Sequence, residues 1–205
     1  MITVVIVTYN TTTLIKQCMS SIRGYYPNIL VIIIDGSPVG SSCYKYTKGI
    51  AGKNTIVKNM GFNIGHGEGL KEGIKLAQTN YVALVDSDTI LKGKPFEPMM
   101  SKMRSNTYGV GKIVLVDKKG MNVDDGIKYL HPYFAVIDKR IYSKFDPIIH
   151  HGAPMINAMI SLAGQNEYEV RDFESIDNYV LHLERGTREQ QPKEFAPKTW
   201  GKVLQ

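Results

Sequence analysis

Two aspartates separated by one residue follow an apolar run near the middle of the chain. Residues 81–85 have the length of a short buried strand, and Asp86, Ser87 and Asp88 come directly after them. Two carboxylates this close at the end of a buried strand repel each other unless a cation shares them. Asp and Ser are also ordinary turn residues, so an Asx-type turn is the alternative to a metal site.

Two earlier apolar runs also end in polar side chains. Residues 2–7 and 29–34 are rich in β-branched residues and almost continuously apolar, which is typical of strands buried on both faces. The polar residues that follow them are Thr8, Tyr9 and Asn10 after the first run, and Asp35 and Ser37 after the second.

The elements that must position these residues have the pattern of an α/β fold. Apolar residues recur at helical spacing in residues 14–22, with threonines before them as candidate N-caps and Gly24 as a stop. A strand, a helix and a second buried strand form a right-handed parallel crossover almost by default. Because ligands bind at the carboxyl ends of parallel strands, we expect the polar residues to converge at one edge of the sheet.

Each polar group has a chemical role at such an edge. Asp35 can accept hydrogen bonds from a base or a ribose, and the corner at residues 8–10 can hold the base through backbone groups and Tyr9. Asp86 and Asp88 can hold a divalent cation between two phosphates. Turn formation and helix capping are the simpler alternatives for each group taken alone.

A glycine run, Gly65-x-Gly67-x-Gly69, lies in residues 59–69, which have the composition of a loop. The run does not match a dinucleotide-binding fingerprint, because it follows the wrong element and has the wrong spacing. A flexible turn into the next helix is the simpler interpretation. Close backbone approach to a sugar or a phosphate is the functional one.

The composition indicates a globular protein with a basic surface. The 205 residues include 25 Lys and Arg against 19 Asp and Glu, for a net charge of +6. This balance favours anionic partners such as nucleotides, phosphorylated lipids or a membrane surface, whereas the scattered basic residues do not indicate a nucleic-acid surface. We expect no signal peptide, no apolar run has the length of a membrane span, and the two cysteines lack metal spacing. We therefore expect a cytoplasmic protein, for which peripheral membrane contact stays open.

Four segments together resemble family 2 glycosyltransferases of the GT-A fold. They are residues 3–10, Asp35-Gly36-Ser37, Asn63-x-Gly65 and Asp86-Ser87-Asp88, in this order and spacing. The resemblance implies a Rossmann-like, mostly parallel central sheet flanked by helices, with a smaller antiparallel acceptor-side region. It also implies a nucleotide-diphosphate sugar donor, UDP- or dTDP-linked, and Mn²⁺ or Mg²⁺ at the DxD motif.

The alternation of strands and helices predicts one domain, in which we expect three parts. Residues 1–90 form the nucleotide-sugar-binding half, residues 91–189 the acceptor-side half and residues 190–205 a C-terminal tail. In the second half, we expect a strand at residues 110–116, a hairpin turn at residues 117–120 and another strand at residues 133–137.

Later segments carry the resemblance to smaller members of that family. Residues 131–135 and 179–188 look like the corresponding segments there, in which a late histidine often completes the metal site. His182 is therefore implied as a third metal ligand beside the two aspartates. Arg185 and Arg188 are expected to steady the departing diphosphate.

The catalytic base is where the chain departs from the family. Many relatives carry an acidic pair at the start of the acceptor-side helix, which we expect near Pro154, but residues 150–154 are His-His-Gly-Ala-Pro. His151 and Asp146 are the candidate bases, with Glu184 as a further alternative.

The sequence thus favours a metal-dependent glycosyltransferase that inverts the anomeric carbon. A nucleotidyltransferase is one alternative, although threonines 11–13 replace the Gly-rich basic loop that such enzymes usually carry after the first strand. A non-catalytic nucleotide-sugar binding protein is the other, and the missing acid supports it. The acceptor stays open between a glycan, a lipid-linked molecule and a protein.

Overall fold

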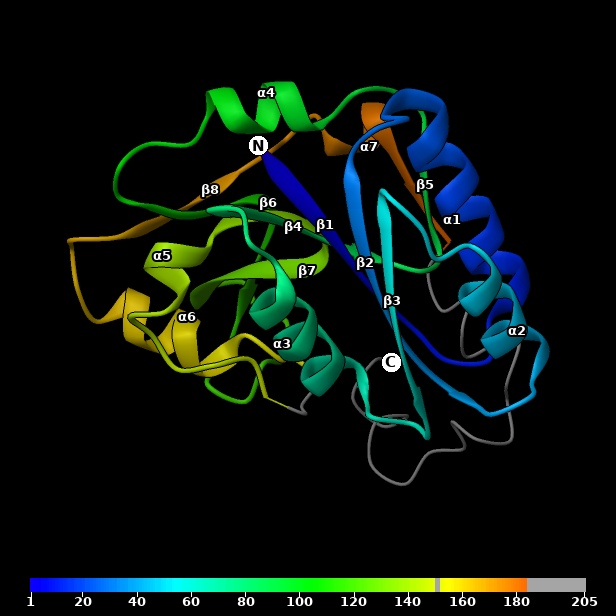
Figure 1. Cartoon of the computed structure of the whole chain (residues 1–205). Coiled ribbons are helices and arrows are strands. Elements are labelled where there is room, and N and C mark those ends of the chain that lie inside the picture. Colours follow the sequence, from blue (N-terminus) through cyan, green and yellow to red (C-terminus); the bar gives the residue numbers. More distant parts are fainter. Residues whose placement is uncertain (150–151, 184–205) are drawn as a thin grey trace.

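A mixed sheet of seven strands forms the centre of the structure, a computed structural model that describes residues 1–149 and 152–183 (Figure 1). The strands of the chain are β1 (Ile2–Thr8), β2 (Leu30–Pro38), β3 (Thr55–Gly61), β4 (Tyr81–Asp86), β5 (Thr89–Leu91), β6 (Thr107–Val116), β7 (Ile127–Asp138), β8 (Glu169–Asp172) and β9 (Val180–His182). The order in the large sheet is β3-β2-β1-β4-β7-β6-β8, and β5 pairs with β9 in a small antiparallel sheet. β1 to β4 run parallel, and β7 is antiparallel to both of its neighbours. This architecture is the expected α/β fold of GT-A type.

Helices cover both faces of the large sheet (Figure 1). They are α1 (Thr12–Tyr25), α2 (Ser42–Gly49), α3 (His66–Leu76), α4 (Phe96–Ser101), α5 (Lys139–Tyr142), α6 (Ile156–Ala163) and α7 (Ile176–Tyr179). Alternate residues of β1 enter different cores: Val5 belongs to the core with α3 and α6, and Val4 and Ile6 belong to the core with α1 and α4. Burial on both faces explains why this strand is apolar without alternation.

Several elements begin or end at other residues than the apolar patterns predicted. β3 continues through residues 59–61, which were expected to be loop, because Asn59 pairs with Asp35 of β2. α1 runs past Gly24 to Tyr25, and α6 begins at Ile156 rather than near Pro154. The turn at residues 117–120 is present, and β7 begins at Ile127, earlier than the expected start at residue 133. Backbone pairing and capping set these limits, and the side-chain pattern does not record them.

Two glycines of α3 allow the helix to lie close to β1. A Cβ atom on Gly69 would lie 2.7 Å from Cγ1 of Val7, and one on Gly73 would lie 2.3 Å from Cγ1 of Val5. Both distances are shorter than carbon atoms tolerate, so neither position has room for a side chain. Gly69 therefore serves helix–strand packing, and the interpretation of the whole glycine run as a flexible turn was wrong for this residue.

No helix within residues 1–149 and 152–183 has both the length and the apolar character needed to span a membrane.

Candidate functional site

The polar ends of β1, β2 and β4 lie at one edge of the sheet. The register places Thr8 beside Asp35 and Val7 beside Asp86, and Ser87 and Asp88 follow directly. Parallel pairing therefore produces the convergence that the sequence predicted.

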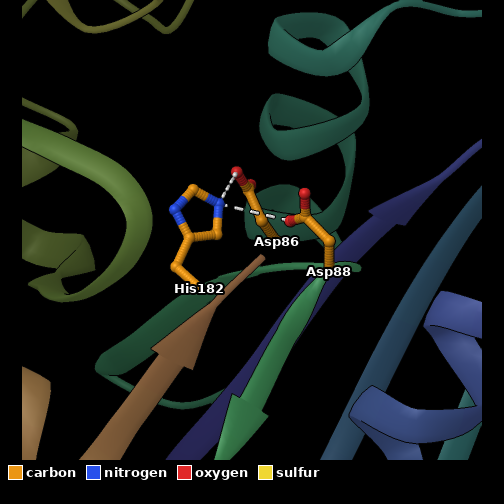
Figure 2. A group of neighbouring side chains, drawn as sticks. All are labelled: Asp86, Asp88 and His182. Atoms are coloured by element: carbon orange, nitrogen blue, oxygen red, sulfur yellow. Dashed lines mark ion pairs between the residues drawn. The ribbon is translucent and has the colours of Figure 1, made fainter. Parts of the chain in front are cut away.

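Asp86, Asp88 and His182 form a compact group at this edge (Figure 2). The Nε2 atom of His182 lies 3.3 Å from Oδ1 of Asp88 and 3.8 Å from Oδ2 of Asp86. One potential ligand atom from each residue lies within 4.8 Å of the others. Two carboxylate oxygens and one imidazole nitrogen are a donor set that suits Mn²⁺ or Mg²⁺.

The small β5–β9 sheet brings His182 to the aspartates. His182 pairs with Thr89, the residue after Asp88, and the Leu183 N–H donates to the Asp88 carbonyl at 3.0 Å. The imidazole stacks on the ring of Tyr133 from β7, with centroids 4.4 Å apart and an interplanar angle of 17°. A backbone ladder and an aromatic contact thus fix the position of a histidine that is remote in sequence.

Because the site is largely buried, two ionised carboxylates are energetically unfavourable there without a bound cation. Burial raises the pKa of Asp86 above its ordinary value, and the charge of Asp88 raises it further, whereas His66 and His182 lower it. The side chains of Asp86 and Asp88 are 22% and 9% exposed, so water screens their repulsion only weakly. A bound cation would relieve this repulsion, which supports the fit of the donor set to a divalent ion.

Hydroxyl contacts tie the corner after β1 to the DxD turn. The Thr8 and Thr11 hydroxyls lie 2.8 Å apart, and the Thr11 hydroxyl lies 3.5 Å from that of Ser87. Because Thr11 makes these contacts, its side chain does not cap α1 as the sequence suggested.

Backbone geometry fixes the same corner. Asn10 has a positive φ of 53° and donates its N–H to the Ser37 hydroxyl at 2.9 Å. A non-glycine residue in this region of φ costs conformational energy and is frequent at functional sites. Tyr9, the remaining predicted residue of the corner, is partly buried.

Asp35 is fully buried and accepts three hydrogen bonds from the protein itself. Oδ1 accepts from the Ser37 N–H at 2.8 Å, and Oδ2 accepts from the Thr47 hydroxyl at 2.6 Å and the Asn59 amide at 2.9 Å. These contacts hold the carboxylate rigidly between β2, β3 and α2. A carboxylate offers about four lone-pair sites, and these contacts occupy three of them.

The other predicted residues are not members of the metal group, and some fall outside the described residues. Asn63 is exposed, and its side chain accepts from the N–H of Gly65, which precedes α3 with a φ of 82°. Asp146 is exposed in the segment between α5 and α6. His151, Glu184, Arg185 and Arg188 fall outside the described residues.

Two histidines at this edge were not among the predicted site residues. His66, the first residue of α3, has its Nε2 atom 3.4 Å from Oδ1 of Asp86. Burial lowers the pKa of His131 to about 4, with further lowering by His182 and His66, so its imidazole is neutral at neutral pH. His131 also accepts a hydrogen bond from the Tyr133 N–H at 3.3 Å. In the sequence, His66 lies in a stretch that was expected to be loop, and His131 lies in a segment noted only for its resemblance to the family. Neither pattern shows which element faces the aspartates.

Comparison with known proteins gives a family match. The sequence profile of Glycosyl transferase family 2 matches residues 3–161. No curated protein sequence matches the chain.

Solved structures with a similar fold include two nucleotide-sugar complexes. A mannosyltransferase, PcManGT from Pyrobaculum calidifontis, in complex with GDP-Man and Mn²⁺, is 13% identical, with a TM-score of 0.61 over 83% of this chain and 54% of that one. S. aureus TarS 1-349 in complex with UDP-GlcNAc is 16% identical, with a TM-score of 0.60 over 87% of this chain and 57% of that one. The chain therefore spans little more than half the length of these proteins, and the likeness shows a shared fold.

Proposed function

Because the chain belongs to Glycosyl transferase family 2, we propose that it transfers a sugar from a nucleotide-diphosphate donor to an acceptor with the help of a divalent cation. The observation that carries this proposal is the group of Asp86, Asp88 and His182 at the carboxyl edge of the parallel strands. This edge is where open α/β sheets bind ligands, and the donor set suits Mn²⁺ or Mg²⁺.

The donor nucleotide is proposed to occupy the edge beside β1 and β2. Asp35 would accept a hydrogen bond from the base or the ribose, and the corner at Thr8, Tyr9 and Asn10 would hold the base. The rigid contacts of Asp35 and the positive φ of Asn10 support a preformed site, because both exclude alternative positions of these groups. The donor is proposed to be UDP- or dTDP-linked, while the two structural neighbours bind GDP-Man and UDP-GlcNAc.

The diphosphate is proposed to lie between Asp86, Ser87 and Asp88 and the start of α3. A divalent cation held by the two aspartates and His182 supplies positive charge for the leaving diphosphate when bound. Tyr133 holds the imidazole of His182 in place by stacking. Asn63, Gly65 and Arg188 complete the proposed donor contacts.

The acceptor reacts on the side opposite the diphosphate. Its oxygen attacks the anomeric carbon from the far face, through a transition state with oxocarbenium character, so that the configuration inverts. His151 and Asp146 are the proposed bases for the acceptor proton. Under this proposal, residues 1–90 bind the donor and residues 91–189 bind the acceptor, with residues 190–205 as a tail.

A non-catalytic nucleotide-sugar binding protein is the second candidate. The segment before α6 favours it, because residues 150–154 contain no acid, whereas many relatives carry an acidic pair near the start of the acceptor-side helix. The binding protein would hold the donor and the cation without turnover.

Turnover with nucleotide sugars distinguishes the two candidates. The wild type should release nucleoside diphosphate from UDP-Glc, UDP-GlcNAc or GDP-Man in the presence of Mn²⁺. Asp88→Asn should lower this rate by roughly 100-fold, since several kcal/mol of charge stabilisation are lost. Asp124→Asn removes an equal charge at an exposed position and should leave the rate unchanged. No release by the wild type would favour the binding protein, and full activity of Asp88→Asn would contradict the assigned metal site.

A further inference from the structure

A second cleft opens at the opposite end of β4 from the candidate donor site. Its volume is about 450 Å³, and it lies between α3, the segment before β4 and α5. Thr79 and Asn80, which line it, precede the first residue of β4, whereas Asp86 is the last residue of this strand. The two regions are therefore separated by the length of the strand, roughly 20 Å.

The charged residues that line this cleft are all positively charged. Of the eleven lining residues, four are cationic, Lys71, Lys75, Lys139 and Arg140, and none of these described lining residues is Asp or Glu. Lys71 and Lys75 are exposed one turn apart on α3, a spacing at which like charges destabilise a helix. Glu68, whose Oε2 atom lies 3.2 Å from Nζ of Lys71, offsets part of this charge, and Glu72, which is paired with Lys58, offsets a further part. An anion in the cleft would offset the rest.

Two of the cationic groups are held in place by the fold. The Lys139 ammonium donates to the Ala77 carbonyl at 2.5 Å, and its backbone N–H donates to the Asn80 carbonyl at 2.8 Å. Arg140 binds the carboxylate of Asp138 through Nε at 3.0 Å and Nη2 at 2.5 Å. The Asp138 side chain is only 2% exposed, while that of Arg140 is 57% exposed. The guanidinium is thus anchored on its inner side and accessible to a ligand.

We propose that this cleft binds a phosphate group. A guanidinium with an accessible edge and several ammonium groups around one volume match the several acceptor oxygens of phosphate. The cleft has the volume of a small-ligand site. The phosphate belongs either to a soluble phosphorylated molecule or to the headgroup of an anionic lipid, and the two sources share this chemistry. The site does not depend on the proposed sugar transfer.

Two binding experiments on the full chain test the proposal, both in EDTA so that no cation occupies the DxD group. One measures co-sedimentation with vesicles of phosphatidylcholine and phosphatidylglycerol in equal parts, against vesicles of phosphatidylcholine alone. The other measures pyrophosphate binding by calorimetry. Lys71→Gln with Lys75→Gln removes two exposed charges from the cleft and leaves the Arg140–Asp138 pair intact.

A matched variant controls for net charge. Lys118→Gln with Lys119→Gln removes two exposed charges in the turn after β6, at the other end of β7 from Arg140. Binding by the cleft variant should be weaker by roughly tenfold, and binding by the control should stay close to that of the wild type.

Each outcome decides the proposal. The proposal is supported if the cleft variant loses binding and the control variant does not. Loss of binding to the vesicles alone indicates a lipid headgroup as the ligand. Loss of binding to pyrophosphate, with or without loss of binding to the vesicles, indicates a free phosphate. If the wild type binds neither probe, or if both double variants lose binding equally, the proposal is wrong.

Discussion

At the scale of single residues, the position of His182 depends on a few specific contacts. Its imidazole reaches Asp86 and Asp88 because the ring is held against Tyr133, with centroids 4.4 Å apart. Groups that contact a metal ligand without touching the ion hold that ligand in its orientation. Their mutation typically lowers metal affinity by roughly 10- to 100-fold. The aromatic ring of Tyr133 should therefore affect metal binding without touching the ion.

The Tyr133 ring can be tested by a pair of substitutions. Tyr133→Leu removes the stacking partner and should weaken Mn²⁺ binding by roughly tenfold, as measured by calorimetry without nucleotide. Tyr133→Phe keeps the ring and should bind Mn²⁺ within about twofold of the wild type. Equal affinities of the Leu and Phe variants would show that stacking does not position His182.

The predicted aspartates lie where the sequence indicated, but their surroundings did not follow from it. Asp86 and Asp88 end an apolar strand, which local pattern detects. The approach of His66 to Asp86 depends on how α3 packs on the sheet, and no pattern of sequence spacing encodes that distance. The contact of Asp35 with Asn59 was missed because residues 59–61 were expected to be loop, and its contact with Thr47 depends on how α2 packs against β2.

At the scale of elements, α3 connects the fold to the site. Its first residue, His66, lies beside Asp86, and its close approach to β1 depends on Gly69 and Gly73. The helical spacing of Leu70 and Ile74 is consistent with the buried face of this helix. It could not predict that glycines were required, because that requirement comes from the side chains of β1.

Alanine substitutions of Gly73 in α3 and of Gly24 in α1 separate the effect of packing from that of helix propensity. Gly73→Ala places a Cβ 2.3 Å from Cγ1 of Val5 and should lower the free energy of unfolding by about 1–3 kcal/mol. Gly24→Ala adds the same methyl group in α1 with no atom within 4 Å and should raise the free energy of unfolding by about 0.5–1 kcal/mol. Urea unfolding measures both. Two shifts of the same sign would contradict the packing assigned to α3.

At the scale of the whole molecule, one sheet with two apolar faces supports several buried polar groups. The continuous apolar strands predicted this architecture, because only a sheet covered on both sides accommodates them. The position of β7 between β4 and β6, which carries His131 and Tyr133 toward the site, was not evident from the sequence. Non-local pairing of this kind has no signal in local periodicity.

Burial of His131 makes the stability of the whole protein depend on pH. Its pKa is about 4 in the folded state and roughly 6.5 when unfolded, so its contribution is complete above pH 6.5 and is lost as pH falls toward 4. Between about pH 7.5 and 4.5, the free energy of unfolding of the wild type should fall by about 1–3 kcal/mol more than that of His131→Asn. Asn keeps an acceptor for the Tyr133 N–H and does not titrate. Urea unfolding in EDTA gives the comparison, and equal pH dependence of the two proteins would contradict the burial of a neutral imidazole.

The central claim is that this chain binds a nucleoside diphosphate through a divalent cation at Asp86, Asp88 and His182. The most direct test is the thermal unfolding midpoint with UDP, dTDP or GDP, each with and without Mn²⁺, and with CMP for comparison. A ligand at 100 times its Kd adds about 2.7 kcal/mol of stability, which corresponds to a shift of roughly 5–10 °C for a protein of this size. We expect at least one nucleoside diphosphate to raise the midpoint by this amount only with Mn²⁺, and Asp88→Asn to abolish the shift. No shift with any nucleoside diphosphate, or an equal shift without Mn²⁺, would contradict the account.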